Sequence, residues 1–245
     1  MNRSNIISAL LFSLAIVIAA YLLGNAFMHR NKSEKKISVV GLGKTDFTSD
    51  LIVWEGSFSA FDQDIKRAYN RLNRDKEIVE KYLIGKGIDK DEIVFSAVQT
   101  TNKTRPIYLE NGNYAGEEFL GYELTQNVTV KSKKVETVEK VGREITELLN
   151  KGVKFYSYSP RYYYTKLEDL KLEMISKATE NARNRAEKIA ENSGAHLGKL
   201  IHAKMGVFQI TGQYSDEDYS WGGTFNTSSK EKTASITMKL TYGIK

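Results

Sequence analysis

The sequence predicts an α+β fold in which helices cover one face of a mainly antiparallel sheet. Apolar and polar residues alternate in several segments, as in half-buried strands, and apolar residues recur at helical spacing in others. Several predicted strands follow one another with no helix between them, which favours hairpins and antiparallel pairing. The predicted element order is β-β-α-β-β-α-β-α-β-β, within one domain over residues 37–245.

Two strands and a helix open this domain. Residues 37–43 form an apolar strand that ends in glycine, and residues 47–60 alternate apolar and polar side chains. Asp62 is a suitable N-cap for a helix over about 63–85, because a carboxylate can accept hydrogen bonds from the first free N–H groups. Gly87 follows this helix as a stop signal.

Further strands and a second helix follow. A strand is expected over 93–101, then a loop marked by Pro106, and then a long half-buried strand over 120–130. Valine, isoleucine and leucine at helical spacing predict a helix over 135–149. Residues 153–165 form another strand, which is rich in tyrosine.

The longest helix is predicted over 166–192, where alanines in the apolar stripe imply close packing against a neighbouring element. Two strands, over 199–210 and 234–242, close the chain. Between them, residues 211–231 are polar and glycine-rich but carry four aromatic side chains. Aromatic residues in such a loop are unusual unless they fold back or contact a partner.

The composition excludes several kinds of chemistry. The chain has 245 residues and no cysteine, which excludes disulfides, thiolate metal sites and cysteine nucleophiles. Its net charge of +6, from 36 basic and 30 acidic residues, is much weaker than the charge typical of a nucleic-acid-binding domain. We therefore expect no nucleic-acid partner, with base stacking on the tyrosine-rich strand as the alternative.

An uncharged, largely apolar segment over 6–28 has the length of a membrane-spanning helix. It is longer than the apolar region of a typical signal peptide and lacks an Ala-x-Ala cleavage motif, which favours an uncleaved anchor. We expect residues 1–30 to anchor the chain in the inner membrane with its domain in the periplasm, after a polar linker over 31–36. Release into the periplasm after cleavage is the alternative, and positive charges on both sides leave the orientation open on charge alone.

Four blocks of sequence resemble the SIMPL-domain family, a group of mostly bacterial exported proteins that includes the periplasmic immunogenic protein. They are ISVVGLG at 37–43, GYELTQNVTV at 121–130, ARNRAEKIA at 182–190 and GAHLGKLI at 194–201. The last two occur together and in the family's order, and the resemblance covers about residues 37–243. Ser49 departs from the family, which usually has proline before the residue at Asp50.

The resemblance implies an exported α+β domain that often self-assembles and is linked in general terms to envelope or oxidative-stress functions. The family has no established enzymatic activity, so it supplies no catalytic residues. We therefore expect a membrane-anchored, non-enzymatic protein that forms a homo-oligomer or binds an unidentified envelope protein.

The spacing of histidine, acidic and hydroxyl residues contains no catalytic or cofactor motif, so no cofactor is expected. His196 and His202 lack a third donor at a fixed spacing, which argues against a metal site. Two arginines flank the alanine stripe and are candidates for a subunit contact or for ion pairs within the helix. The candidate contacts with a partner or a second copy are Arg183, Arg185, Tyr214, Tyr219, Trp221 and Phe225. The alternative function is a small-molecule-binding or enzymatic domain that uses the 197–231 region.

Overall fold

The structure is a computed structural model, and it describes residues 3–30, 35–218 and 220–245. The first of these segments is helix α1 (Arg3–Arg30), whose side chains are described over 11–25. Among the described residues, no helix is both long and apolar enough to cross a membrane. Parts of the anchor predicted over 6–28, like most of the linker predicted over 31–36, lie outside the described side chains, and both stay predictions.

The chain packs as two compact units. One unit consists of 1–41, 180–204 and 239–245, and the other consists of 42–179 and 205–238. Both units are built from antiparallel strands and covering helices, so the predicted α+β class is confirmed. The single domain expected over 37–245 stays a prediction.

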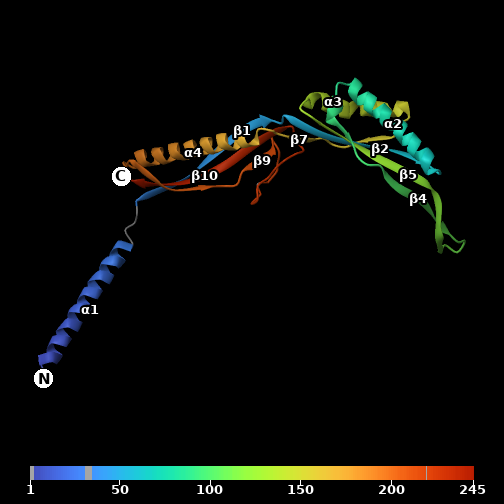
Figure 1. Cartoon of the computed structure of the whole chain (residues 1–245). Coiled ribbons are helices and arrows are strands. Elements are labelled where there is room, and N and C mark those ends of the chain that lie inside the picture. The colour runs from blue at the N-terminus through green and yellow to red at the C-terminus, as the bar shows by residue number, and fades with distance from the viewer. Residues whose placement is uncertain (1–2, 31–34, 219) are drawn as a thin grey trace. The chain divides into compact units, whose positions relative to one another are not determined.

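The first sheet has the strand order β1-β10-β8, and β9 pairs with β10. These strands are β1 (Lys36–Thr48), β8 (Leu197–Met205), β9 (Gln209–Gly212) and β10 (Glu231–Ile244). Helix α4 (Leu167–Asn192) runs along β1 and β10 (Figure 1). Alternate residues of β1 are buried, as the period of two predicts for a strand with one covered face.

Helix α4 approaches this sheet through small side chains. Its buried residues recur every four positions and are Leu170, Met174, Ala178, Ala182, Ala186 and Ala190. Facing them, Gly43 of β1 has no side chain, and a Cβ there would lie 2.5 Å from the Met174 carbonyl oxygen. The alanine stripe therefore packs closely, as its composition predicts.

The second sheet lies within the larger unit and has the order β3-β5-β2-β6, with β4 paired to β5 and β7 paired to β2. Its strands are β2 (Leu51–Asp62), β3 (Ile93–Phe95), β4 (Gln99–Tyr108), β5 (Tyr114–Ser132), β6 (Phe155–Ser157) and β7 (Arg161–Tyr163). Helices α2 (Ile65–Gly85) and α3 (Val135–Glu144) contact it, and the short 3₁₀ helices are Lys90–Glu92 and Ile145–Lys151.

The core of this unit is built around aromatic rings on β2 and β6. Trp54 and Phe58 are fully buried, and each stacks on Phe155, with ring centroids 5.9 and 6.4 Å apart. The Trp54 indole N–H donates to the Ser157 hydroxyl at 3.0 Å, so the only polar atom of the indole is satisfied. A Cβ at Gly142 of α3 would lie 3.1 Å from that indole nitrogen, which lets the helix pack closely over the ring.

Four predicted features differ from the structure in detail. The tyrosine-rich strand over 153–165 is two short strands, β6 and β7, and the strand over 199–210 is divided into β8 and β9. The N-cap of α2 is Asp64, whose carboxylate accepts from the backbone N–H groups of Lys66 and Arg67 at 2.8 and 3.0 Å. The largest difference is the expected loop around Pro106, which forms the hairpin of β4 and β5.

Candidate functional site

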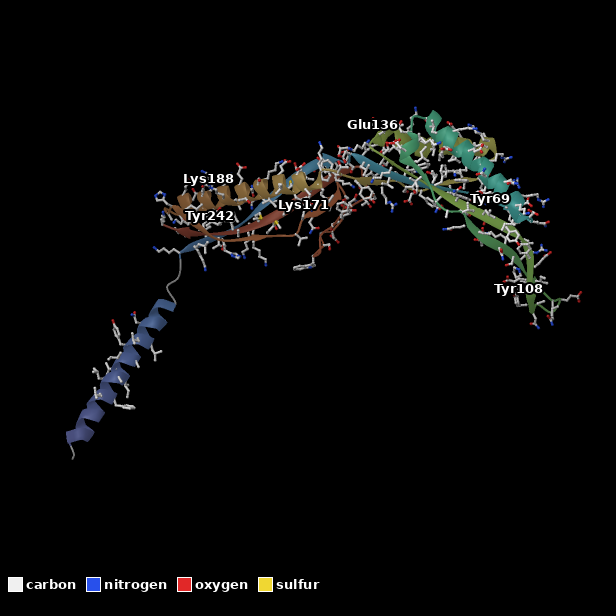
Figure 2. All side chains as sticks on the ribbon, viewed as in Figure 1. Tyr69, Tyr108, Glu136, Lys171, Lys188 and Tyr242 are labelled. Atoms are coloured by element: carbon white, nitrogen blue, oxygen red, sulfur yellow. The ribbon has the colours of Figure 1, made fainter. Side chains whose placement is uncertain are left out.

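The outer part of the β4–β5 hairpin, residues 104–119, extends beyond the rest of the second sheet. Strand β2 pairs with β5 only from Tyr122 onward, and every residue of β4 is exposed. Figure 2 labels Tyr108 near the end of this hairpin, away from α2. We call residues 104–119 the hairpin arm. Among the described strands, the two strands of the arm pair only with each other, from Thr104 opposite Phe119 to Tyr108 opposite Tyr114.

The hairpin arm carries apolar side chains that this chain does not bury. They are Ile107, Tyr108, Leu109, Tyr114 and Phe119, with exposed fractions between 44% and 61%. The rings of Tyr108 and Tyr114 contact each other across the strands at a centroid distance of 6.2 Å. A two-stranded ribbon is marginal by itself in water, and clustered exposed apolar residues mark interaction sites.

The arm was not predicted, although the sequence carries a signal for it. Asn111-Gly112 is the dipeptide that best fits a tight hairpin turn, and Gly112 has a φ of 81°. The Leu109 N–H donates to the Asn113 carbonyl oxygen at 2.8 Å and closes the turn. Ile107 and Tyr108 precede this turn and Tyr114 follows it. The turn signal could therefore have predicted that these residues lie on two paired strands.

The aromatic loop over 211–231 is held in place by polar side chains from its two ends. Asn226 is buried, and its side-chain amide donates to the Glu217 carboxylate while its carbonyl accepts from the Ser229 N–H at 2.9 Å. The Lys232 ammonium donates to the Asn226 backbone carbonyl at 2.6 Å. Asn226 thus fixes the returning half of the loop against the start of β10.

Two groups of this network have shifted pKa values. Burial lowers the pKa of Lys232 to about 8, although the negative charge of Glu217 acts in the opposite direction. The backbone N–H of Gly212, and after it the Asn226 amide, lower the pKa of Glu217 because they donate to its carboxylate. Glu217 is therefore charged at neutral pH and serves as an acceptor within the loop.

Trp221 stands on a short turn that Gln209 of β9 fixes. The Gln209 amide donates to the Ser220 carbonyl at 2.8 Å, and its carbonyl accepts from the Thr224 N–H at 2.7 Å. Gly223 has a φ of 97°, and a Cβ there would lie 3.0 Å from the Phe208 carbonyl oxygen, so this turn favours glycine. The Trp221 side chain itself is 99% exposed.

A mainly apolar pocket of about 400 Å³ lies beside this turn. Its apolar walls are Leu42 of β1, Val207, Trp221 and Ile236 of β10, and its polar walls are Gln209, Ser220, Ser235 and Thr237. Leu42 and Val207 are about half exposed, so the pocket is open to solvent on an apolar surface. Its volume lies in the range of small-molecule sites, about 300–1,000 Å³.

The structure separates the residues predicted as contacts. Tyr214 is 97% exposed at a positive φ of 58°, Phe225 is about half exposed and pairs with Ile210, and Tyr219 lies outside the described residues. Tyr214 lines a second, polar pocket with Lys44 and Glu217, separate from the pocket beside Trp221. The role of these side chains as partner contacts stays a prediction.

The two candidate arginines both have partners within their own unit. The Arg183 guanidinium donates to the Glu187 carboxylate at 2.8 Å, which raises its pKa above the usual value. The Arg185 guanidinium donates to the Val40 carbonyl at 3.0 Å, on β1 at the edge of the first sheet. Both arginines have exposed side chains, so these bonds leave a subunit contact as a prediction.

The tyrosine-rich segment packs onto β2 through ion pairs and hydroxyl contacts. The Arg161 guanidinium pairs with Glu55, and the Tyr158 hydroxyl lies 3.3 Å from the Ser57 hydroxyl. Burial, and then a hydrogen bond to Glu139, raise the pKa of Tyr162 to about 12. Within the described segments, no three histidine, aspartate or glutamate side chains are grouped closely enough to hold a metal ion.

Comparison with known proteins yields one family. No curated protein matches the chain. Residues 37–242 match the model of the SIMPL family, which is described as a protein of unknown function (DUF541). This range covers both sheets, all four candidate sequence blocks and the helices α2, α3 and α4. The chain therefore belongs to the SIMPL family.

Proposed function

We propose that this chain is a non-enzymatic protein of the cell envelope that self-assembles through the hairpin arm. The observation that carries the proposal is the exposure of Ile107, Tyr108 and Tyr114 on a ribbon whose two strands pair, among the described strands, only with each other. Burying these side chains against a second copy would stabilise the complex by about 25 cal/mol for each Å² of apolar surface.

The backbone of the arm supports the same proposal. Among the described strands, residues 114–121 of β5 have no partner on the side where β2 ends, and β4 pairs on one side only. Both edges of the arm therefore carry free N–H and C=O groups that another strand can bind. Pro106 removes one donor from β4, which leaves the free side of β5 as the better edge.

The arm carries one basic and three acidic residues, a net charge of −2, so two identical arms repel each other modestly and salt screens this repulsion. Arg105 pairs with Glu118 across the two strands, and Lys103, just before the arm, pairs with Glu123 at 2.6 Å. Glu110 and Glu117 add two negative charges. Self-assembly through the arm therefore rests on the burial of its apolar side chains and not on its charge.

The compartment rests on the sequence. The uncharged segment over 6–28, together with the export that the resemblance implies, supports a location in the periplasm, with the segment either retained as an anchor or cleaved. The wider role is an envelope or oxidative-stress function, as the resemblance implies. Cell fractionation with protease accessibility tests the location, and a domain that stays protease-protected in spheroplasts would contradict it.

Sedimentation velocity of the purified chain across a concentration series tests self-assembly. We expect a concentration-dependent oligomer that Tyr108→Asp converts to monomer, because the substitution places a charge among the arm's apolar side chains. The matched control is Tyr69→Asp, since Tyr69 is an equally exposed tyrosine on α2, at 53% against 61%. A strict monomer for the unmodified chain, or equal loss of assembly in both variants, would refute the proposal.

A further inference from the structure

The pocket beside Trp221 has the size and lining of a ligand site that the proposed function does not use. Its volume is about 400 Å³, and Leu42 and Val207 give it apolar walls that remain about half exposed. Trp221 adds an aromatic face at the rim, where its side chain is almost wholly in contact with solvent. An exposed indole beside an open apolar pocket is costly in water unless a ligand covers it.

The pocket is ordered before any ligand binds. Gln209 is buried and uses both its amide and its carbonyl to hold residues 220–224, at 2.8 and 2.7 Å. On the far side of the loop, Asn226 is held by Glu217, Ser229 and Lys232. A rim that is already fixed does not lose conformational entropy when a ligand binds.

The loop segment that carries Trp221 has a net charge opposite in sign to that of the whole protein. Residues 211–229 contain three acidic residues and no lysine or arginine, whereas the chain as a whole carries +6. Glu217 uses its carboxylate within the loop, but Asp216 and Asp218 are exposed. An aromatic face on an acidic loop attracts cations, and it repels the anionic surface of a membrane or a nucleic acid.

We propose that this pocket binds an amphipathic organic cation. The apolar body of the ligand lies against Leu42 and Val207, and its ammonium group lies over the Trp221 ring, on the loop that also carries Asp216 and Asp218. Indole rings are the strongest natural partners of quaternary ammonium groups. The ligand is a small molecule, because the pocket is of small-molecule size and not an extended groove. This inference is independent of the proposed self-assembly and goes beyond it.

The fluorescence of Trp221 provides a direct test. The chain has two tryptophans, and Trp54 is 1% exposed whereas Trp221 is 99% exposed, so a ligand in the pocket changes chiefly the Trp221 emission. We expect hexyltrimethylammonium to shift the emission of the full chain to shorter wavelength with a saturable dependence on concentration. Hexanesulfonate and 1-hexanol have the same alkyl chain without the positive charge and should bind much more weakly.

Substitutions in and near the pocket test whether the ligand binds beside Trp221. We expect the double change Asp216→Asn and Asp218→Asn to weaken binding roughly fivefold, since it removes charge but little volume. Trp221→Phe should abolish the spectral change and weaken binding measured by calorimetry. Asp91→Asn is the control, because Asp91 is an exposed carboxylate on a different element and should leave binding unchanged.

Three outcomes would overturn the proposal. They are no saturable change up to concentrations on the order of 10 mM, equal binding of the anionic or the neutral probe, and equal effects of the Asp216/Asp218 and Asp91 changes. Titrating the arm variant Tyr108→Asp separates this test from the one for assembly. Binding should persist in that variant, and its loss there would also refute a site confined to the Trp221 pocket.

Discussion

Gly43 of β1 lies directly against the backbone of Met174 in α4. A Cβ at position 43 would come within 2.5 Å of the Met174 carbonyl oxygen and 3.1 Å of the Ala178 nitrogen. Both obstructions are backbone atoms, so a rotamer change cannot relieve them. The contact therefore sets how closely α4 can approach the sheet.

Gly43→Ala should destabilise the protein by about 2–3 kcal/mol, because the helix must move away from β1 to admit one methyl group. Urea unfolding followed by circular dichroism measures the loss. Gly85→Ala is the matched control, since a Cβ at Gly85 meets no atom within 4 Å, and alanine has the higher helix propensity. Equal stability of Gly43→Ala and the unmodified protein would show that α4 does not pack at this distance.

A backbone hydrogen bond of Ser49 explains why this chain lacks the proline that is usual at this position in its family. The Ser49 N–H donates to the Lys230 carbonyl at 3.0 Å, a bond that proline cannot make. Its hydroxyl is buried and has no hydrogen-bond partner in the described structure. We expect Ser49→Ala to stabilise the protein by about 1 kcal/mol and Ser49→Pro to destabilise it. Thermal unfolding compares the two, and a loss of stability in Ser49→Ala would contradict the burial of an unpaired hydroxyl.

Lys232 makes stability depend on pH in the alkaline range. Its pKa is about 8 in the folded protein, against an ordinary value of 10.5, so the unfolded chain binds more protons between these values. The contribution of Lys232 to stability therefore rises as the pH rises through 8 and levels off above the unfolded pKa. From about pH 8 to about pH 9.5, we expect the free energy of unfolding of the unmodified chain to rise by about 2 kcal/mol relative to that of Lys232→Met.

Chemical denaturation of both proteins at each pH measures this difference. Keeping the pH below the ordinary pKa of tyrosine avoids the titration of Tyr162, whose pKa is raised to about 12. Lys239→Met, which removes an exposed lysine from the same strand, is the control and should show no such change. A flat difference for Lys232→Met would mean that Lys232 keeps its ordinary pKa.

The hairpin arm should gain protection from hydrogen exchange only on assembly. In the isolated chain, the amides of 104–119 should exchange faster than those of Val128 and Val130, which lie between two paired strands and are fully buried. At concentrations that produce the oligomer, the arm should become protected. Exchange mass spectrometry measures this, and Tyr108→Asp should leave the arm unprotected at every concentration.

The parts that were predicted are those whose burial repeats along the chain. Helix α4 was predicted to within one residue because its buried side chains recur every four positions from Leu170 to Ala190. The alternation of β10 likewise follows from its single covered face. Local spacing carries enough information where one side of an element is buried and the other is not.

The parts that were missed lack such a pattern. The arm is exposed on both faces, so its sequence does not alternate, and Pro106 favoured a loop. The order of the aromatic loop depends on Gln209, Asn226 and Lys232, whose partners lie up to 15 residues away along the chain. Contacts of this kind follow from the tertiary fold, and hydrophobic periodicity does not report them.

The close contact between Gly56 and Phe155 constrains which residues members of the family can carry at these two positions. A Cβ at Gly56 would lie only 2.3 Å from Cζ of the Phe155 ring, which stacks on Trp54 and Phe58 in the second sheet. A relative with a larger residue at 56 must therefore carry a smaller one at 155. Either substitution made alone, before the other, would disrupt the packing. The two positions should covary among SIMPL sequences, with intermediates rare because each single step passes through a less stable protein.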